Sequence, residues 1–202
     1  VAGSRRVPHE AVALKYRREY RKPMVSTNSP GRATGQGLHE GYSIHEAAAE
    51  LRLYQWYSMM VKVQGVGVYA KTYPLDFHNE NVRRYARQSR ILMEFFDSLR
   101  DYVDMKPQAA RITRGPGKYR VNMASPNEAV VYIHTEDFRE CIAAGAVLAL
   151  EDLPLADGDV TATLFHPAIG NEEHRQATIR DGGFEIRLPA LKEDLAVHVL
   201  PK

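Results

Sequence analysis

Polar side chains able to bind a ligand or transfer a proton follow a short β-prone run at residues 24–27. An amide, a hydroxyl and a guanidinium group come first, and an imidazole and a carboxylate stand together later in the same Gly-rich segment: Asn28, Ser29, Arg32, His39 and Glu40. A carboxylate in a loop can act as a general acid or base, and the other groups can hold a polar ligand. Alternatively, His39 and Glu40 are a solvated loop pair, and Asn28, Ser29 and Arg32 belong to the turn around Pro30-Gly31.

Two tyrosines, Tyr69 and Tyr73, flank the end of a second apolar run at residues 65–70. A tyrosine offers a flat apolar face together with a hydroxyl, which suits a ligand that has both apolar and polar faces. Core packing is the alternative for Tyr69. The two tyrosines complete the set of candidate binding residues.

The sequence lacks the residues that a disulfide, a metal site or a phosphate-binding loop would need. The single cysteine, Cys141, excludes an internal disulfide and a cysteine zinc site. His134 and His166 have no third ligand at a metal-binding spacing, and there is neither a Gly-rich phosphate loop nor a nucleophile elbow. We therefore expect no metal and no cofactor.

Helical and strand patterns alternate over residues 1–103. Ser43 and Glu46 form a capping-box pattern at the start of the best-marked helix. The apolar run at 65–70 is typical of a parallel strand covered on both faces. The elements expected here are helices at 10–20, 44–62 and 79–102, the last of them amphipathic, and strands at 24–27 and 65–70.

The period of the apolar residues changes to two after Asp104, as expected for half-buried strands. Asp181-Gly182-Gly183 between two such runs predicts a hairpin turn. Short strands with frequent turn signals predict an antiparallel β-sandwich. The strands are expected at 119–123, 129–134, 147–150, 160–165, 176–180, 184–188 and 195–200. We therefore expect an α/β domain at 1–103 and an all-β domain at 104–202.

Composition and charge narrow the classes of partner. The 202 residues are 44% hydrophobic and 26% charged, as in an ordinary globular chain, and no run of about 18 apolar residues predicts a membrane span. Residues 1–103 carry a net charge of +6 and residues 104–202 one of −4. Because no aromatic and basic residues interleave, we expect no nucleic acid and no membrane as partner. The compartment stays open, secreted and periplasmic included.

Several short motifs resemble the C-terminal end of a TIM-barrel glycoside hydrolase followed by the small β-sandwich that ends such enzymes. They are Lys22-Pro23 before the strand at 24–27, the strand at 129–134, the segment at 160–170 that ends in His166-Pro167-Ala168-Ile169-Gly170, and the ending at 188–196. The resemblance implies that residues 1–103 are the last βα units of a (β/α)8 barrel with parallel strands. The remainder of the barrel is then expected upstream, in the same or a partner chain.

The resemblance also implies roles for the candidate residues. A retaining glycosidase of this kind takes its nucleophile from the end of barrel strand seven, where this sequence reads Ser26-Thr27-Asn28-Ser29. Glu46 is assigned to the capping box, which leaves Glu40 as the catalytic carboxylate. Asn28, Ser29, Arg32, His39, Tyr69 and Tyr73 are then expected to bind the sugar, the tyrosines by stacking on its ring.

Two other functions fit the same residues. One is a non-catalytic protein that binds carbohydrate through a degenerate barrel site. The other is a structural role, in which the sandwich supports the barrel. The expected function is hydrolysis of O-glycosyl bonds in a polysaccharide or oligosaccharide.

Overall fold

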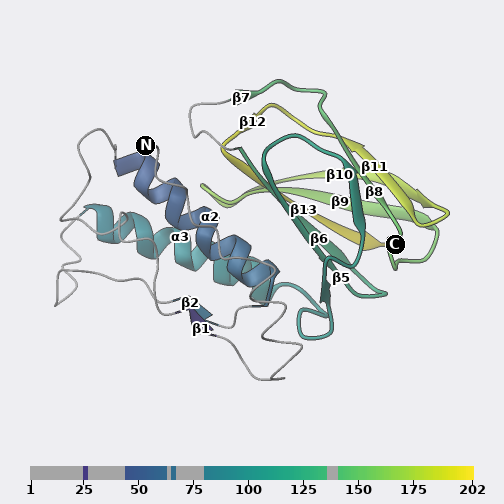
Figure 1. The fold of residues 1–202 in the computed structure, drawn as a ribbon, viewed down its shortest axis with the longest axis horizontal. Helices are drawn as coiled ribbons and strands as arrows, with labels where there is room; N and C mark the ends of the chain where they lie inside the picture. The colour runs from purple at the N-terminus through teal and green to yellow at the C-terminus, as the bar shows by residue number, and fades with distance from the viewer. Residues whose placement is uncertain (1–24, 27–43, 63–64, 67–79, 136–140) are drawn as a thin grey trace. The chain divides into compact units, whose positions relative to one another are not determined.

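The computed structural model describes residues 25–26, 44–62, 65–66, 80–135 and 141–202 (Figure 1). The chain divides into two units, Val1–Arg90 and Ile91–Lys202. The predicted helix at 10–20 lies outside the described residues. The predicted capping pair also lies outside them, because Ser43 and the side chain of Glu46 are not described.

The described residues of the first unit form two helical segments and one short strand pair. Strand β1 (Val25–Ser26) pairs in parallel with β2 (Gly65–Val66), and Val25 lies opposite Gly65. Helix α2 (Ile44–Met60) is buried nearly all round, as its apolar sequence predicts. Its largest fully buried side chains are Trp56, Arg52, Leu51 and Met60. The parallel pairing predicted between residues 24–27 and 65–70 is therefore confirmed over these two residue pairs.

Helix α3 (Glu80–Asp97) is amphipathic as predicted, and its residues from Ile91 onward belong to the second unit. Ile91, Leu92, Phe95 and Phe96 are buried, whereas Arg83, Arg87 and Arg90 are exposed. The helix ends at Asp97 rather than at Tyr102. The Ser98 hydroxyl donates to the Phe95 carbonyl at 2.7 Å, and the backbone N–H of Leu99 donates to the carbonyl of Phe96, three residues back, where an α-helix would pair four back.

The second unit is built on one nine-stranded antiparallel sheet, which curls into a half-barrel (Figure 1). Its order is β3-β5-β6-β13-β9-β10-β11-β8-β4. A separate short pair joins β7 (Cys141–Ile142) and β12 (Leu191–Lys192). In chain order the strands of the large sheet are β3 (Lys106–Pro107), β4 (Arg111–Arg114), β5 (Tyr119–Ala124), β6 (Ala129–His134), β8 (Val147–Glu151), β9 (Gly158–His166), β10 (Asn171–Arg180), β11 (Gly183–Arg187) and β13 (Asp194–Pro201).

The predicted fold class is wrong. The sheet is antiparallel throughout, and the described part of the chain contains two helices and a single two-residue parallel pair, not a (β/α)8 segment. The β-sandwich is not supported either, because β9 pairs with both β10 and β13 and so continues one sheet where two were expected. Alternation at a period of two defines which face of a strand is buried, but it does not define which strands pair.

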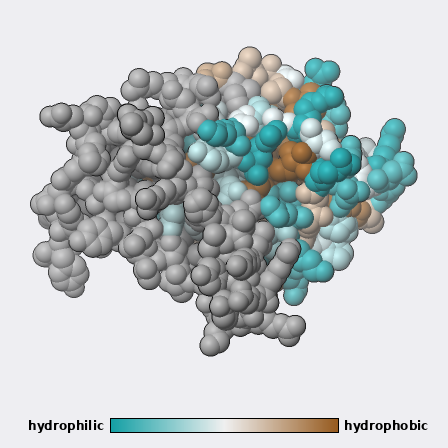
Figure 2. Space-filling view, viewed as in Figure 1, coloured by the Kyte–Doolittle hydropathy of each residue, from teal (hydrophilic) through white to brown (hydrophobic). Residues whose placement is uncertain are grey.

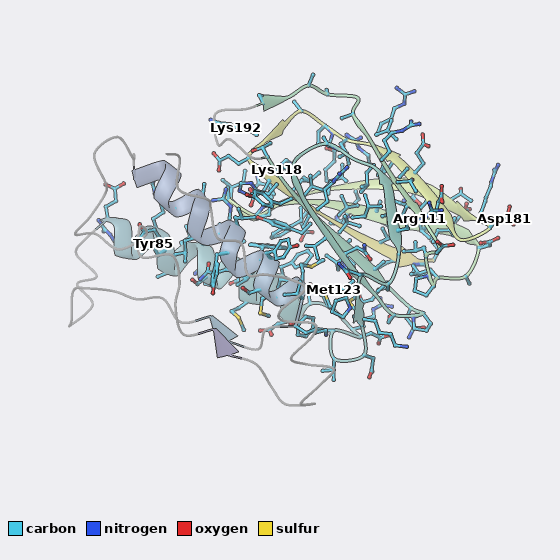
Figure 3. All side chains as sticks on the ribbon, in the orientation of Figure 1. Tyr85, Arg111, Lys118, Met123, Asp181 and Lys192 are labelled. Carbon is cyan, nitrogen blue, oxygen red and sulfur yellow. The ribbon has the colours of Figure 1, made fainter. Side chains whose placement is uncertain are left out.

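The core of the second unit lies on the inner face of the curled sheet. Val131, Leu150, Leu164, Phe184 and Val197 are at most 2% exposed and belong to one apolar cluster. Because successive side chains of a strand point to opposite faces, residues next to them in sequence lie on the outer face. The surface of this unit visible in Figure 2 is mostly hydrophilic. Figure 3 shows all described side chains on this framework, with Arg111 on β4 and Met123 on β5 labelled.

The hairpin between β10 and β11 turns at Asp181 and Gly182, as the Asp181-Gly182-Gly183 pattern predicts. Both residues have positive φ, 51° and 69°, which two-residue hairpin turns require. The carboxylate of Asp157 accepts hydrogen bonds from their backbone N–H groups, at 2.8 Å from Asp181 and 3.2 Å from Gly182. These two bonds lower the pKa of Asp157 below its ordinary value.

We expect Asp157→Ala to lower the melting temperature by a few degrees at pH 7. A carboxyl whose pKa is lower in the folded than in the unfolded protein stabilises the fold above about pH 4, and that contribution disappears as the pH falls through the lowered pKa. The difference in melting temperature between wild type and variant, measured by circular dichroism, should therefore shrink as the pH falls below about 4. Asp104→Ala, an exposed aspartate in the same unit, is the control. An unchanged difference at low pH would contradict this role of the carboxylate.

Candidate functional site

All seven predicted site residues lie outside the described residues: Asn28, Ser29, Arg32, His39, Glu40, Tyr69 and Tyr73. The nearest described elements are β1, which precedes Asn28 in sequence, and β2, which precedes Tyr69. Since β1 and β2 are parallel, their carboxyl ends lie at the same edge of the pair. The roles assigned to the seven residues stay predictions.

Buried polar contacts join α2 to the first part of α3 within the first unit. The amide of Gln88 donates to the carbonyl of Ala48 at 3.2 Å and accepts from Nη1 of Arg52 at 2.8 Å, in the orientation that satisfies both. The amide of Gln55 donates to the hydroxyl of Ser89 at 3.0 Å. Because Arg52 is only 1% exposed, its guanidinium serves packing between helices and is not a site for a ligand from solvent.

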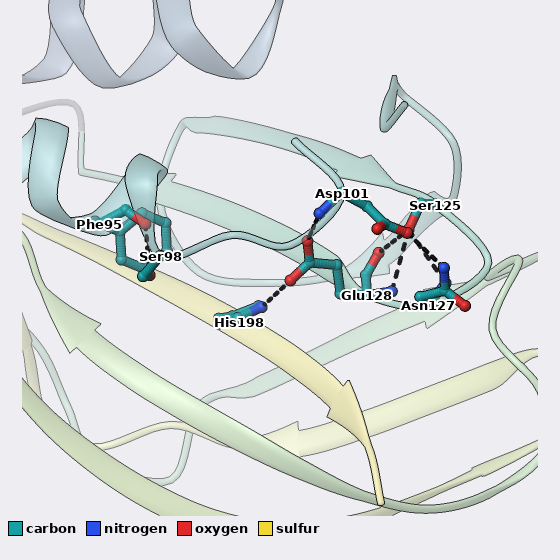
Figure 4. A network of polar contacts seen from close by, with 7 residues as sticks. All are labelled: Phe95, Ser98, Asp101, Ser125, Asn127, Glu128 and His198. Atoms are coloured by element: carbon teal, nitrogen blue, oxygen red, sulfur yellow. Dashed lines mark hydrogen bonds and ion pairs between the residues drawn. The ribbon is translucent and has the colours of Figure 1, made fainter. Parts of the chain in front are cut away.

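The densest polar network described in the second unit surrounds Glu128, in the turn between β5 and β6 (Figure 4). Its side chain is fully buried. One carboxylate oxygen accepts from the backbone N–H of Asp101 at 2.6 Å, and the other lies 2.8 Å from Nε2 of His198 on β13. Glu128 thus connects the segment after α3 to two strands of the sheet.

The turn itself is held by Ser125. Its hydroxyl oxygen accepts from the backbone N–H groups of Asn127 at 3.1 Å and Glu128 at 3.2 Å, and the hydroxyl donates to Asp101 at 3.0 Å. The side-chain amide of Asn127 donates to the same Asp101 oxygen at 2.6 Å. Asp101 is therefore bound to this turn through its backbone N–H and its carboxylate together.

His198 faces a carboxylate on one side and aromatic rings on the other. Burial lowers its pKa below the ordinary value, although the hydrogen bond and the charge of Glu128 act in the opposite direction; Arg100 lowers the pKa further and Glu172 raises it. The Phe95 ring lies 6.1 Å from the imidazole and 4.7 Å from the ring of Phe165, centroid to centroid. At pH 7 the neutral imidazole donates from Nε2 to the carboxylate.

A second buried polar group lies where β6 and β13 meet. The hydroxyl of Tyr132 donates to Asp194 at 2.9 Å, and Thr135 donates to the carbonyl of Glu193 through its backbone N–H and its hydroxyl. Nδ1 of His134 contacts the carbonyl of Thr135. His134, which the sequence analysis considered as a metal ligand, therefore belongs to a packed interior.

Neither buried group is arranged to act on a ligand. His198 is 7% exposed and Glu128 is enclosed, so a proton on this pair has no path to a bound substrate. Among the described residues, no three His, Cys, Asp or Glu side chains group in a way that could hold a metal ion, and no helix is long and apolar enough to cross a membrane. The geometry assigns the Glu128 network to holding the end of α3 on the sheet.

Sequence reasoning did not identify this network. Ser125-Pro126-Asn127 is a turn signature and predicts a reversal of the chain between the two strands. Nothing in the sequence indicates that Glu128 meets His198, because their contact depends on the pairing of β6 with β13.

Comparison with known proteins gives matches in structure only. No family model matches the sequence, and no curated protein matches it. A solved structure described as a glycoside hydrolase has a TM-score of 0.63 and 11% identity, over 96% of this chain and 46% of that one. A glycoside hydrolase family 5 structure from Bacteroides vulgatus ATCC 8482 has a TM-score of 0.59 and 12% identity, over 95% of this chain and 45% of that one.

A noncanonic maltogenic alpha-amylase from Thermotoga neapolitana has a TM-score of 0.51 and 10% identity, over 95% of this chain and 45% of that one. At these identities the likeness concerns the fold. The chain spans less than half the length of each of these three structures. The predicted resemblance to glycoside hydrolases is thus confirmed at the level of fold neighbours.

Proposed function

We propose that this chain is part of a glycoside hydrolase that acts on a polysaccharide or oligosaccharide. The observation that supports this most strongly is the likeness to three enzymes of carbohydrate breakdown over at least 95% of the chain. The likeness covers both units. A likeness over the curled sheet alone could have been explained by a shared accessory domain.

We assign the chemistry to the first unit and an accessory role to the curled sheet. Glu40 is the catalytic acid or base. Asn28, Ser29, Arg32 and His39 bind sugar hydroxyls, and Tyr69 and Tyr73 provide stacking faces. The parallel β1–β2 pair supports this assignment, because the segments that carry these residues follow two strand ends at one edge.

A non-catalytic protein that binds carbohydrate is the second candidate. The observation in its favour is the sequence Ser26-Thr27-Asn28-Ser29 after β1, which contains no carboxylate. Both candidates require a carbohydrate ligand and differ in whether a bond is broken.

The test is an assay of the full natural-length protein on a panel of soluble polysaccharides and oligosaccharides. Formation of new reducing ends with at least one of them is expected. Affinity electrophoresis in gels containing the same polysaccharides is run in parallel. Retarded migration without new reducing ends would favour the second candidate, and absence of both would contradict the proposal.

A further inference from the structure

We draw no further inference here: the strongest candidate, the side-chain cluster on β9 and β10 in which Nδ1 of His174 lies 2.9 Å from the hydroxyl oxygen of Thr163 and Nε2 lies 3.8 Å from a carboxylate oxygen of Glu172, carries nothing, because the pairing of His174 with Thr163 across the two strands already explains the contact and nothing in the structure shows what the cluster would bind.

Discussion

Replacing Glu40 with glutamine should lower the turnover number for the best carbohydrate substrate at least about 100-fold, with little change in KM. Glutamine keeps the size and hydrogen-bonding capacity of the side chain but cannot give or take the proton. Initial rates of reducing-end formation by the full natural-length protein measure the effect. The turnover number should fall because the acid or base acts in the bond-breaking step and not in binding.

The matched control for this experiment is Glu46→Gln. Glutamine can replace glutamate in a capping box, so this variant should retain normal turnover and stability. Near-normal turnover of Glu40→Gln would remove Glu40 from the mechanism. The carbohydrate-binding alternative would then be the better account of the chain.

Replacing Glu128 with alanine should lower the free energy of unfolding by about 3 kcal/mol at pH 7. The change leaves two donors without an acceptor, the buried Nε2–H of His198 and the partly buried backbone N–H of Asp101. It also removes one of the bonds that hold the segment after α3 on the sheet, while the bonds of the Asp101 carboxylate to Ser125 and Asn127 remain. Urea unfolding followed by circular dichroism measures the loss.

Glu185→Ala, an exposed glutamate of β11, is the control and should change the free energy of unfolding by less than about 0.5 kcal/mol. A loss below about 1 kcal/mol in Glu128→Ala would show that the network contributes little.

The stability of the wild type should also fall as the pH drops below about 6.5. The pKa of His198 is lower in the folded than in the unfolded protein, so the unfolded chain binds a proton that the folded chain does not. His198→Gln removes this titrating group. The free energy of unfolding of the variant should therefore depend less on pH between about 6.5 and the lowered pKa. Unfolding curves at a series of pH values measure the slope, and an unchanged slope in the variant would contradict the assignment.

Local patterns were sufficient to predict most of the elements. The amphipathic spacing over residues 79–102 identified α3, although the helix ends earlier, at Asp97. The strand at 129–134 was predicted with the bounds that the structure gives. The turn at Asp181-Gly182-Gly183 was predicted correctly because a tight hairpin turn with positive φ strongly favours those residue types. Each of these features depends on residues close in sequence.

Pairing between distant segments was not predictable in the same way. The alternation of buried and exposed residues along β11 would suit a sandwich as well as a single curled sheet. Only the pairing of β9 with both β10 and β13 distinguishes the two. The contact of Glu128 with His198 spans 70 positions and leaves no local signal.

Hydrolysis of an O-glycosyl bond by this protein can be followed in water labelled with heavy oxygen. The full natural-length protein is incubated with its best substrate in this water, and the products are analysed by mass spectrometry. A sample of unlabelled product in the same water corrects for exchange. One labelled oxygen is expected in each newly formed reducing end, at a rate that Glu40→Gln lowers at least about 100-fold. Products without label, or no products from any carbohydrate that the protein binds, would contradict it.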